Sequence, residues 1–246
     1  MSSVGWAAPV PPGAPNLAGP ALLERAIGYT RASLQLVAQA DLRGRTPCRD
    51  WDLLSLLHHM DDSLAAFTDA AEIGYVDLLP LPGTVGPEGA ASPADRLGAP
   101  TAPTTAPIGR TATPAEPTSA PTDATATPAD DVARMLIERL KQRACAALGA
   151  WASPPVGAIA VADRELRSDL LAAAGALEIA VHGWDVARAC GVDRPLPPAL
   201  AVELLDVVPA LVGPEDRPQR FAEAIAVPLH ARPSTRLLAA VGRRAV

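Results

Sequence analysis

Apolar residues recur at helical spacing in four long segments of the chain. Leu23, Ile27, Leu34 and Val37 predict a first helix over residues 20–40. A second helix is predicted from an N-cap at Asp52 to about residue 72, because one apolar stripe runs along it: Leu53, Leu56, Leu57, Met60, Leu64 and Phe67. The same spacing predicts a third helix over 127–151 and a fourth from 165 or 168 to 190, ended by Gly191. Four long amphipathic helices are typical of an antiparallel bundle.

The remaining segments predict shorter elements. A short extended piece is expected at 157–161 after two prolines. Beyond the fourth helix, the pattern predicts a proline-started helix from about 196 to 212, a strand at 224–227 and a last helix from 233 to 241. The predicted fold class is therefore mainly α: a four-helix bundle over 20–192 with a small C-terminal α/β extension over 193–246.

Proline divides the chain of 246 residues unevenly. Of 27 prolines, eleven lie between Pro80 and Pro128 and five in the first twenty residues. Segments rich in Pro, Ala and Thr bury too little apolar surface to offset the entropy of ordering. We therefore expect a flexible arm at 1–19 and a disordered insertion at 77–129, between the second and third helices. About 175 residues remain, which suits one domain.

Charge and cysteine content exclude several classes of function. The net charge is −6 and Lys and Arg form no runs, which argues against a nucleic-acid partner. No uninterrupted apolar run of about 18 residues occurs, so no membrane span is expected, and the first twenty residues do not resemble a signal peptide. Three irregularly spaced cysteines favour a reduced, cytoplasmic location.

The fourth predicted helix carries a candidate metal-binding pair. Glu178 and His182 are four residues apart and share one helix face, where a carboxylate oxygen and an imidazole nitrogen can reach one divalent metal. Asp185 lies on the same face and could orient His182 by accepting a hydrogen bond from its other ring nitrogen. An ordinary polar pair has the same spacing, so this alternative stays open.

The chain has four histidines, which limits the choice of a third ligand. On a helical wheel of the second helix, His58 points away from the apolar stripe, whereas His59 lies on its flank. His230 falls in an irregular segment. His59 is thus the candidate that could face the fourth helix, although a partly buried histidine is often only structural.

Two motifs resemble a known family. Residues 46–51 (Thr-Pro-Cys-Arg-Asp-Trp) followed by Leu53, Leu56, Leu57 and His59, and residues 178–191 (Glu-Ile-Ala-Val-His-Gly-Trp-Asp-Val-Ala-Arg-Ala-Cys-Gly), closely resemble the actinobacterial mycothiol-dependent maleylpyruvate isomerase family. That family belongs to the DinB-like superfamily of metal-binding four-helix bundles. The segment 224–244 also resembles the family's C-terminal stretch. The resemblance covers roughly residues 22–75 and 130–244.

The resemblance implies a function and a site. His59, Glu178 and His182 coincide with the family's divalent metal ligands, usually zinc, with Asp185 beside them. Mycothiol would bind with its sulfur at the open metal position as a thiolate, and would attack an electrophilic small molecule by thiol transfer or in a cis–trans isomerisation. Two alternatives remain: a metal-binding protein without catalysis, and a metal hydrolase that uses bound water.

Other residues of the two motifs have a simpler interpretation. Trp51 and Trp184 are expected to pack in the core, with Trp51 anchoring the start of the second helix. Cys48 and Cys190 are expected to be structural, because neither has a neighbour in the sequence that clearly generates a thiolate.

Overall fold

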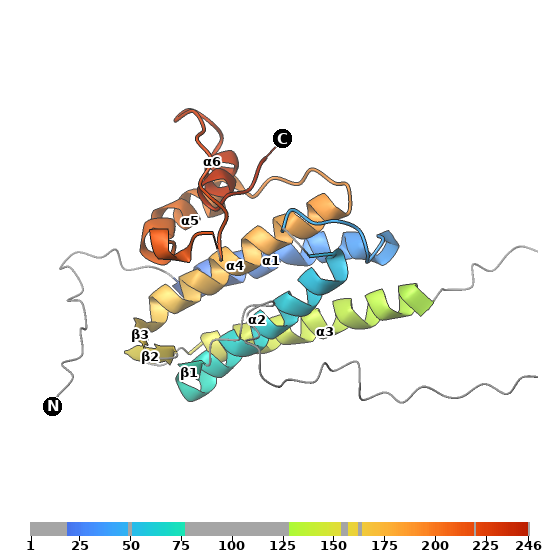
Figure 1. Cartoon of the computed structure of the whole chain (residues 1–246). Coiled ribbons are helices and arrows are strands. Elements are labelled where there is room, and N and C mark those ends of the chain that lie inside the picture. The colour runs from blue at the N-terminus through green and yellow to red at the C-terminus, as the bar shows by residue number, and fades with distance from the viewer. Residues whose placement is uncertain are drawn as a thin grey trace, which may run out of the picture. The chain divides into compact units, whose positions relative to one another are not determined.

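The computed structural model describes residues 19–48, 51–76, 128–153, 157–161, 164–218 and 220–245, which are mainly helical, as predicted (Figure 1). Of the arm predicted at 1–19 and the insertion predicted at 77–129, residues 1–18 and 77–127 lie outside the described residues. The predicted bounds are too wide at both helix starts, because residue 19 begins the first helix and residues 128–129 begin the third. The helices described are α1 (Gly19–Leu34), α2 (Leu53–Ile73), α3 (Pro128–Trp151), α4 (Ser168–Ala189), α5 (Pro198–Leu211) and α6 (Pro233–Ala240). The first predicted helix is divided, because α1 gives way to a 3-10 turn, η1 (Gln35–Gln39).

The four long helices pack around a common apolar core. α1 lies against α4 and α3, and α2 lies against α3 and α4. Each helix contributes fully buried side chains to one cluster, among them Leu23, Leu57, Leu140 and Ile179. Trp151, at the end of α3, is buried and donates from its indole nitrogen to the carbonyl of Phe67 at 2.9 Å. This packing places α2 beside α4, the two helices that carry the candidate ligands.

The start and face of α2 follow from its sequence. The side chain of Asp52 caps the helix by accepting from the backbone N–H of Ser55 at 2.8 Å, and Gly74 ends it with a φ of 70°. The predicted stripe is buried, apart from a half-buried Phe67. As the helical wheel predicted, His58 is exposed and His59 is partly buried on the flank of the stripe.

α4 is the central helix of the core and approaches α1 closely. A Cβ at Gly183 would lie 2.3 Å from Thr30 Oγ1, and that hydroxyl donates to the carbonyl of Ile179 at 2.7 Å. In the described part of the chain, α4 alone is long and apolar enough to cross a membrane by length and composition, but 83% of the relevant window is buried inside the fold. Burial in the core therefore accounts for its apolar sequence.

A small sheet lies at one end of α2 and α4. Its strands are β1 (Tyr75–Val76), β2 (Ala158–Val161) and β3 (Arg164–Arg167), in the order β1–β2–β3. β1 is parallel to β2, and β2 is antiparallel to β3 with Ala158 opposite Arg167. The extended piece predicted at 157–161 is confirmed as β2. Its two partner strands were not predicted.

The C-terminal extension contains no strand within residues 193–218 and 220–245. α5, a 3-10 turn η3 (Pro214–Asp216) and α6 form it, and α5 packs on α4 and α6 (Figure 1). The strand predicted at 224–227 is wrong. The N–H of Ile225 bonds instead to the carbonyl of Ala239, at the end of α6, and Pro228 follows directly. The predicted α/β extension is therefore helical.

Candidate metal centre

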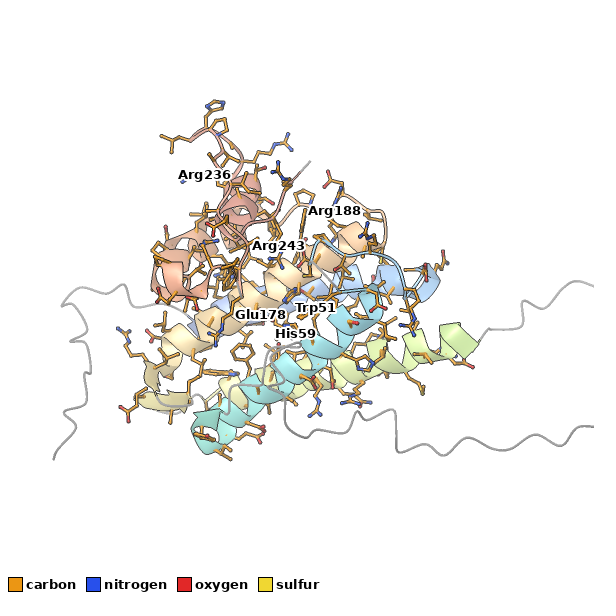
Figure 2. All side chains as sticks on the ribbon, viewed as in Figure 1. Trp51, His59, Glu178, Arg188, Arg236 and Arg243 are labelled. Carbon is orange, nitrogen blue, oxygen red and sulfur yellow. The ribbon has the colours of Figure 1, made fainter. Side chains whose placement is uncertain are left out.

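α2 and α4 bring two histidines to one carboxylate oxygen. His59 Nε2 donates to Glu178 Oε1 at 2.6 Å, and His182 Nε2 lies 3.2 Å from the same oxygen. The two imidazole rings stand edge to face with centroids 5.0 Å apart. Figure 2 shows His59 and Glu178 together where α2 meets α4. We call His59, Glu178 and His182 the histidine–glutamate centre.

Two neighbours complete this side of the centre. Ser63, one turn after His59 on α2, donates from its hydroxyl to Glu178 Oε1 at 3.2 Å. Trp51 lies beside His59 (Figure 2). Its ring packs on His59 with centroids 4.6 Å apart and lies 6.1 Å from the ring of His182. Trp51, predicted to pack in the core at the start of the second helix, is half-buried at the edge of the core and packs against the site.

The other nitrogen of His182 faces a second polar group. His182 Nδ1 lies 3.0 Å from Asp185 Oδ2, the contact that the spacing on α4 suggested. Cys48 Sγ donates to the same carboxylate oxygen at 3.1 Å and lies 3.7 Å from His182 Nδ1. We call Cys48, His182 and Asp185 the cysteine cluster.

Arg243 reaches this cluster from the C-terminal segment. Its Nη2 donates to Asp185 Oδ2 at 3.0 Å and to Cys48 Sγ at 3.1 Å, and its Nε donates to Asp185 Oδ1 at 3.3 Å. The Arg243 side chain is 12% exposed and that of Asp185 is fully buried. The ion pair therefore compensates a carboxylate that has no access to water.

Burial and charge act in opposite directions on the pKa values of these groups. Burial disfavours the charge on Glu178, but the His182 charge and hydrogen bonds from both histidines outweigh it, so the pKa of Glu178 lies well below its ordinary value. Burial likewise opposes the charge on His182, yet Glu178 and the bond to Asp185 hold the pKa of His182 well above its ordinary value. Despite its burial, the pKa of Asp185 is lowered by the hydrogen bond from His182 and by Arg243.

The histidine–glutamate centre has the donor set of a metal site. Its three ligand atoms all lie within 4.8 Å of one another, and so do those of the cysteine cluster, so each group could hold a metal ion. Two imidazole nitrogens and one carboxylate oxygen form a recognised set for catalytic zinc, which leaves a fourth position free. The side chains of His59 and Glu178 are 29% and 26% exposed, whereas His182 is 8% exposed. Solvent therefore reaches His59 and Glu178, whereas His182 is nearly buried.

The structure thus assembles all four residues predicted from the sequence: His59, Glu178, His182 and Asp185. It also brings in Ser63, Cys48 and Arg243, which sequence reasoning did not place there. Ser63 follows His59 by four residues, so the helical spacing could have indicated it. Cys48 is half-buried in a polar network. The contact of Arg243 with Asp185 is tertiary and has no local signal.

The other motif residues lie away from these contacts. Trp184 is buried in the core, and the Arg188 guanidinium lies 5.9 Å from its ring centroid. Cys190 is half-buried, which raises the pKa of its thiol. His58 and His230 are both exposed. None of these side chains reaches the histidine–glutamate centre in the described structure.

Comparison of the chain with protein-family models, with curated proteins and with solved structures gave no match. The function of the chain is therefore inferred from the geometry of the candidate centre and from the two sequence motifs that supply its residues.

Proposed function

We propose that this chain is a divalent-metal-dependent enzyme of the DinB-like four-helix bundle type, which uses a small thiol, mycothiol, to attack an electrophilic small molecule. The observation that carries the proposal is the convergence of His59 and His182 on Glu178 Oε1, with all three ligand atoms within 4.8 Å. The family resemblance of the two motifs supplies the thiol and the reaction class, thiol transfer or cis–trans isomerisation.

The residues of the centre have distinct roles in this proposal. His59 Nε2, His182 Nε2 and a carboxylate oxygen of Glu178 would hold zinc or another divalent metal. In the structure, Glu178 Oε1 lies within 3.2 Å of the Nε2 atoms of both histidines, and a bound metal would replace the protons that these contacts share. Asp185 orients His182, because accepting from Nδ1 leaves the Nε2 lone pair for the metal.

The surroundings suit a reaction on one open side. When bound, the metal supplies a Lewis acid that keeps a coordinated thiol deprotonated at neutral pH. Trp51 covers part of the His59 ring and restricts its orientation. Ser63 holds Glu178 from α2 through its hydroxyl. The partial exposure of His59 and Glu178 leaves the approach for thiol and substrate on their side.

Cobalt-substituted protein tests the proposal directly. Adding mycothiol to the wild-type cobalt protein should produce a sulfur-to-cobalt charge-transfer band, because the thiol sulfur enters the open coordination position. A simple thiol that lacks the sugar portions of mycothiol serves as the control for selectivity. A cobalt protein that stays unchanged with saturating mycothiol would reject the thiol-using function, while intact metal binding would still leave a hydrolase or a non-catalytic metal protein.

A further inference from the structure

The cysteine cluster shares His182 with the histidine–glutamate centre but lies on the other side of its ring. Its donors are a thiol, an imidazole nitrogen and a carboxylate oxygen, which together suit borderline metals such as Zn²⁺ and Co²⁺. Within this cluster, Asp185 Oδ2 lies 3.0 Å from His182 Nδ1 and 3.1 Å from Cys48 Sγ. All three donors lie within 4.8 Å of one another, as do those of the proposed functional centre.

The guanidinium of Arg243 is a cation that already binds this cluster. Arg243 Nη2 contacts both the thiol of Cys48 and the carboxylate of Asp185, two of the three donors. An arginine remains charged under all ordinary conditions, and the charge of Asp185 raises the pKa of Arg243 further despite its burial. A divalent ion could use these donors only after displacing the guanidinium.

The backbone holds Arg243 in place. The preceding Gly242 has a φ of 76°, and a Cβ there would lie 2.7 Å from atoms of Ala222. This tight turn after α6 directs the next residue toward α4, and Arg243 Nη1 also donates to the carbonyl of Val241 at 3.3 Å. The guanidinium is therefore fixed over the cluster by packing as well as by charge.

We infer that the cysteine cluster is a latent second metal site, which Arg243 occupies as a built-in cation. Arg243 thereby restricts metal to the histidine–glutamate centre and keeps the Cys48 sulfur from serving as a ligand. The inference rests on the proposed metal centre only through the shared His182. Removing the guanidinium leaves a thiol, an imidazole nitrogen and a carboxylate free to take a metal ion, which displaces the protons of Cys48 and His182 Nδ1. If the histidine–glutamate centre is filled as well, His182 binds both ions as an imidazolate, one through each ring nitrogen.

Cobalt spectra without any added small thiol test this inference. Folded Arg243→Ala protein, saturated with cobalt, should gain a sulfur-to-cobalt band that a further Cys48→Ser substitution removes. The matched control is Arg244→Ala, which loses the same charge from the neighbouring, exposed residue and should gain no band. Arg243→Met, which keeps an unbranched apolar side chain, is measured beside Arg243→Ala in case the smaller side chain prevents folding.

Two results would overturn the inference. One is a folded Arg243 variant that is saturated with cobalt and shows no band dependent on Cys48. The other is a Cys48-dependent band in the wild-type protein, found by comparing it with Cys48→Ser, and this comparison needs no change at Arg243. Because no mycothiol is present, failure here is distinct from failure of the proposed function, which is the absence of a band when mycothiol is added to wild-type protein.

Discussion

His59 on α2 and Glu178 on α4 are joined by a hydrogen bond of 2.6 Å, across 119 residues of sequence. The adjacent His58 is exposed and faces away from the apolar stripe of α2. His58 and His59 therefore form a matched pair for substitution. Both are histidines on α2, but His59 alone of the two contacts Glu178 in the structure.

Replacing His59 by Ala should abolish metal retention, because the centre loses one of its three ligands. His58→Ala should retain the metal of the wild-type protein. The measurement is the metal content of purified protein by elemental analysis after dialysis against zinc, with circular dichroism to verify the helical fold. If His58→Ala loses the metal and His59→Ala keeps it, the proposed ligand set is wrong.

Asp185→Asn should weaken metal binding about 10- to 100-fold, the usual effect of removing the partner of a histidine ligand. The amide keeps the size of the carboxylate but loses the charge that favours a proton on His182 Nδ1. Competition with a chromogenic chelator gives the affinity. Asp193→Asn is the control, because the Asp193 side chain is 70% exposed and lies in the segment that follows the C-terminus of α4. Equal affinities of the two variants would contradict the orienting role of Asp185.

The pH dependence of stability should reverse between metal-free and metal-bound protein. In the metal-free chain, the raised pKa of His182 adds stability that is complete below its ordinary 6.5 and is lost as pH rises through the folded value. The lowered pKa of Glu178 adds stability above its ordinary 4.5, which is lost as pH falls through the folded value. Metal binding requires deprotonated ligands, so its stabilising effect should grow as pH rises.

Thermal unfolding followed by circular dichroism checks this reversal. With a chelator present, Tm should fall as pH rises above 6.5, and the added stabilisation by zinc should increase over the same interval. His182→Gln is the control, since it removes the titrating group and should flatten the metal-free decline. The prediction fails if, with chelator present, the Tm of the wild-type protein falls no more with rising pH than the Tm of His182→Gln. His182 would then not stabilise the metal-free fold.

Gly183→Ala should destabilise the fold by about 1–3 kcal/mol, because the new methyl group collides with Thr30 where α1 and α4 meet. The matched control is Gly28→Ala on α1, where a Cβ meets nothing within 4 Å and should stabilise the helix by up to about 1 kcal/mol. Urea unfolding of both variants gives the two free energies. Similar values would mean that the α1–α4 contact tolerates a side chain.

Sequence patterns predicted the parts of this structure that depend on local burial. The stripe on α2 and the cap at Asp52 gave the helix and distinguished His58 from His59, because a helical period reports which face is buried. The sheet was largely missed, since β1 has only two residues and β3 is polar, with Arg164, Glu165 and Arg167. The strand predicted at 224–227 failed because a run of apolar residues does not provide a partner strand.

The residues of the candidate site also differ in whether the sequence could predict their contacts. Glu178, His182 and Asp185 lie within eight positions of one helix, so their shared face was visible in the sequence. Arg243 lies 58 residues beyond Asp185, and its contact depends on how α6 and Gly242 direct the chain back to α4. No period or spacing encodes such an approach.

The position of Arg243 in the sequence has a consequence for the order of synthesis. His59, Glu178, His182 and Cys48 have all been translated about 60 residues before Arg243. At roughly 5–20 residues per second, this interval lasts about 3–12 s. During these seconds Cys48, His182 and Asp185 have been made and Arg243 has not. Arg243 is therefore the last part of the cluster to be synthesised, after every donor that it covers.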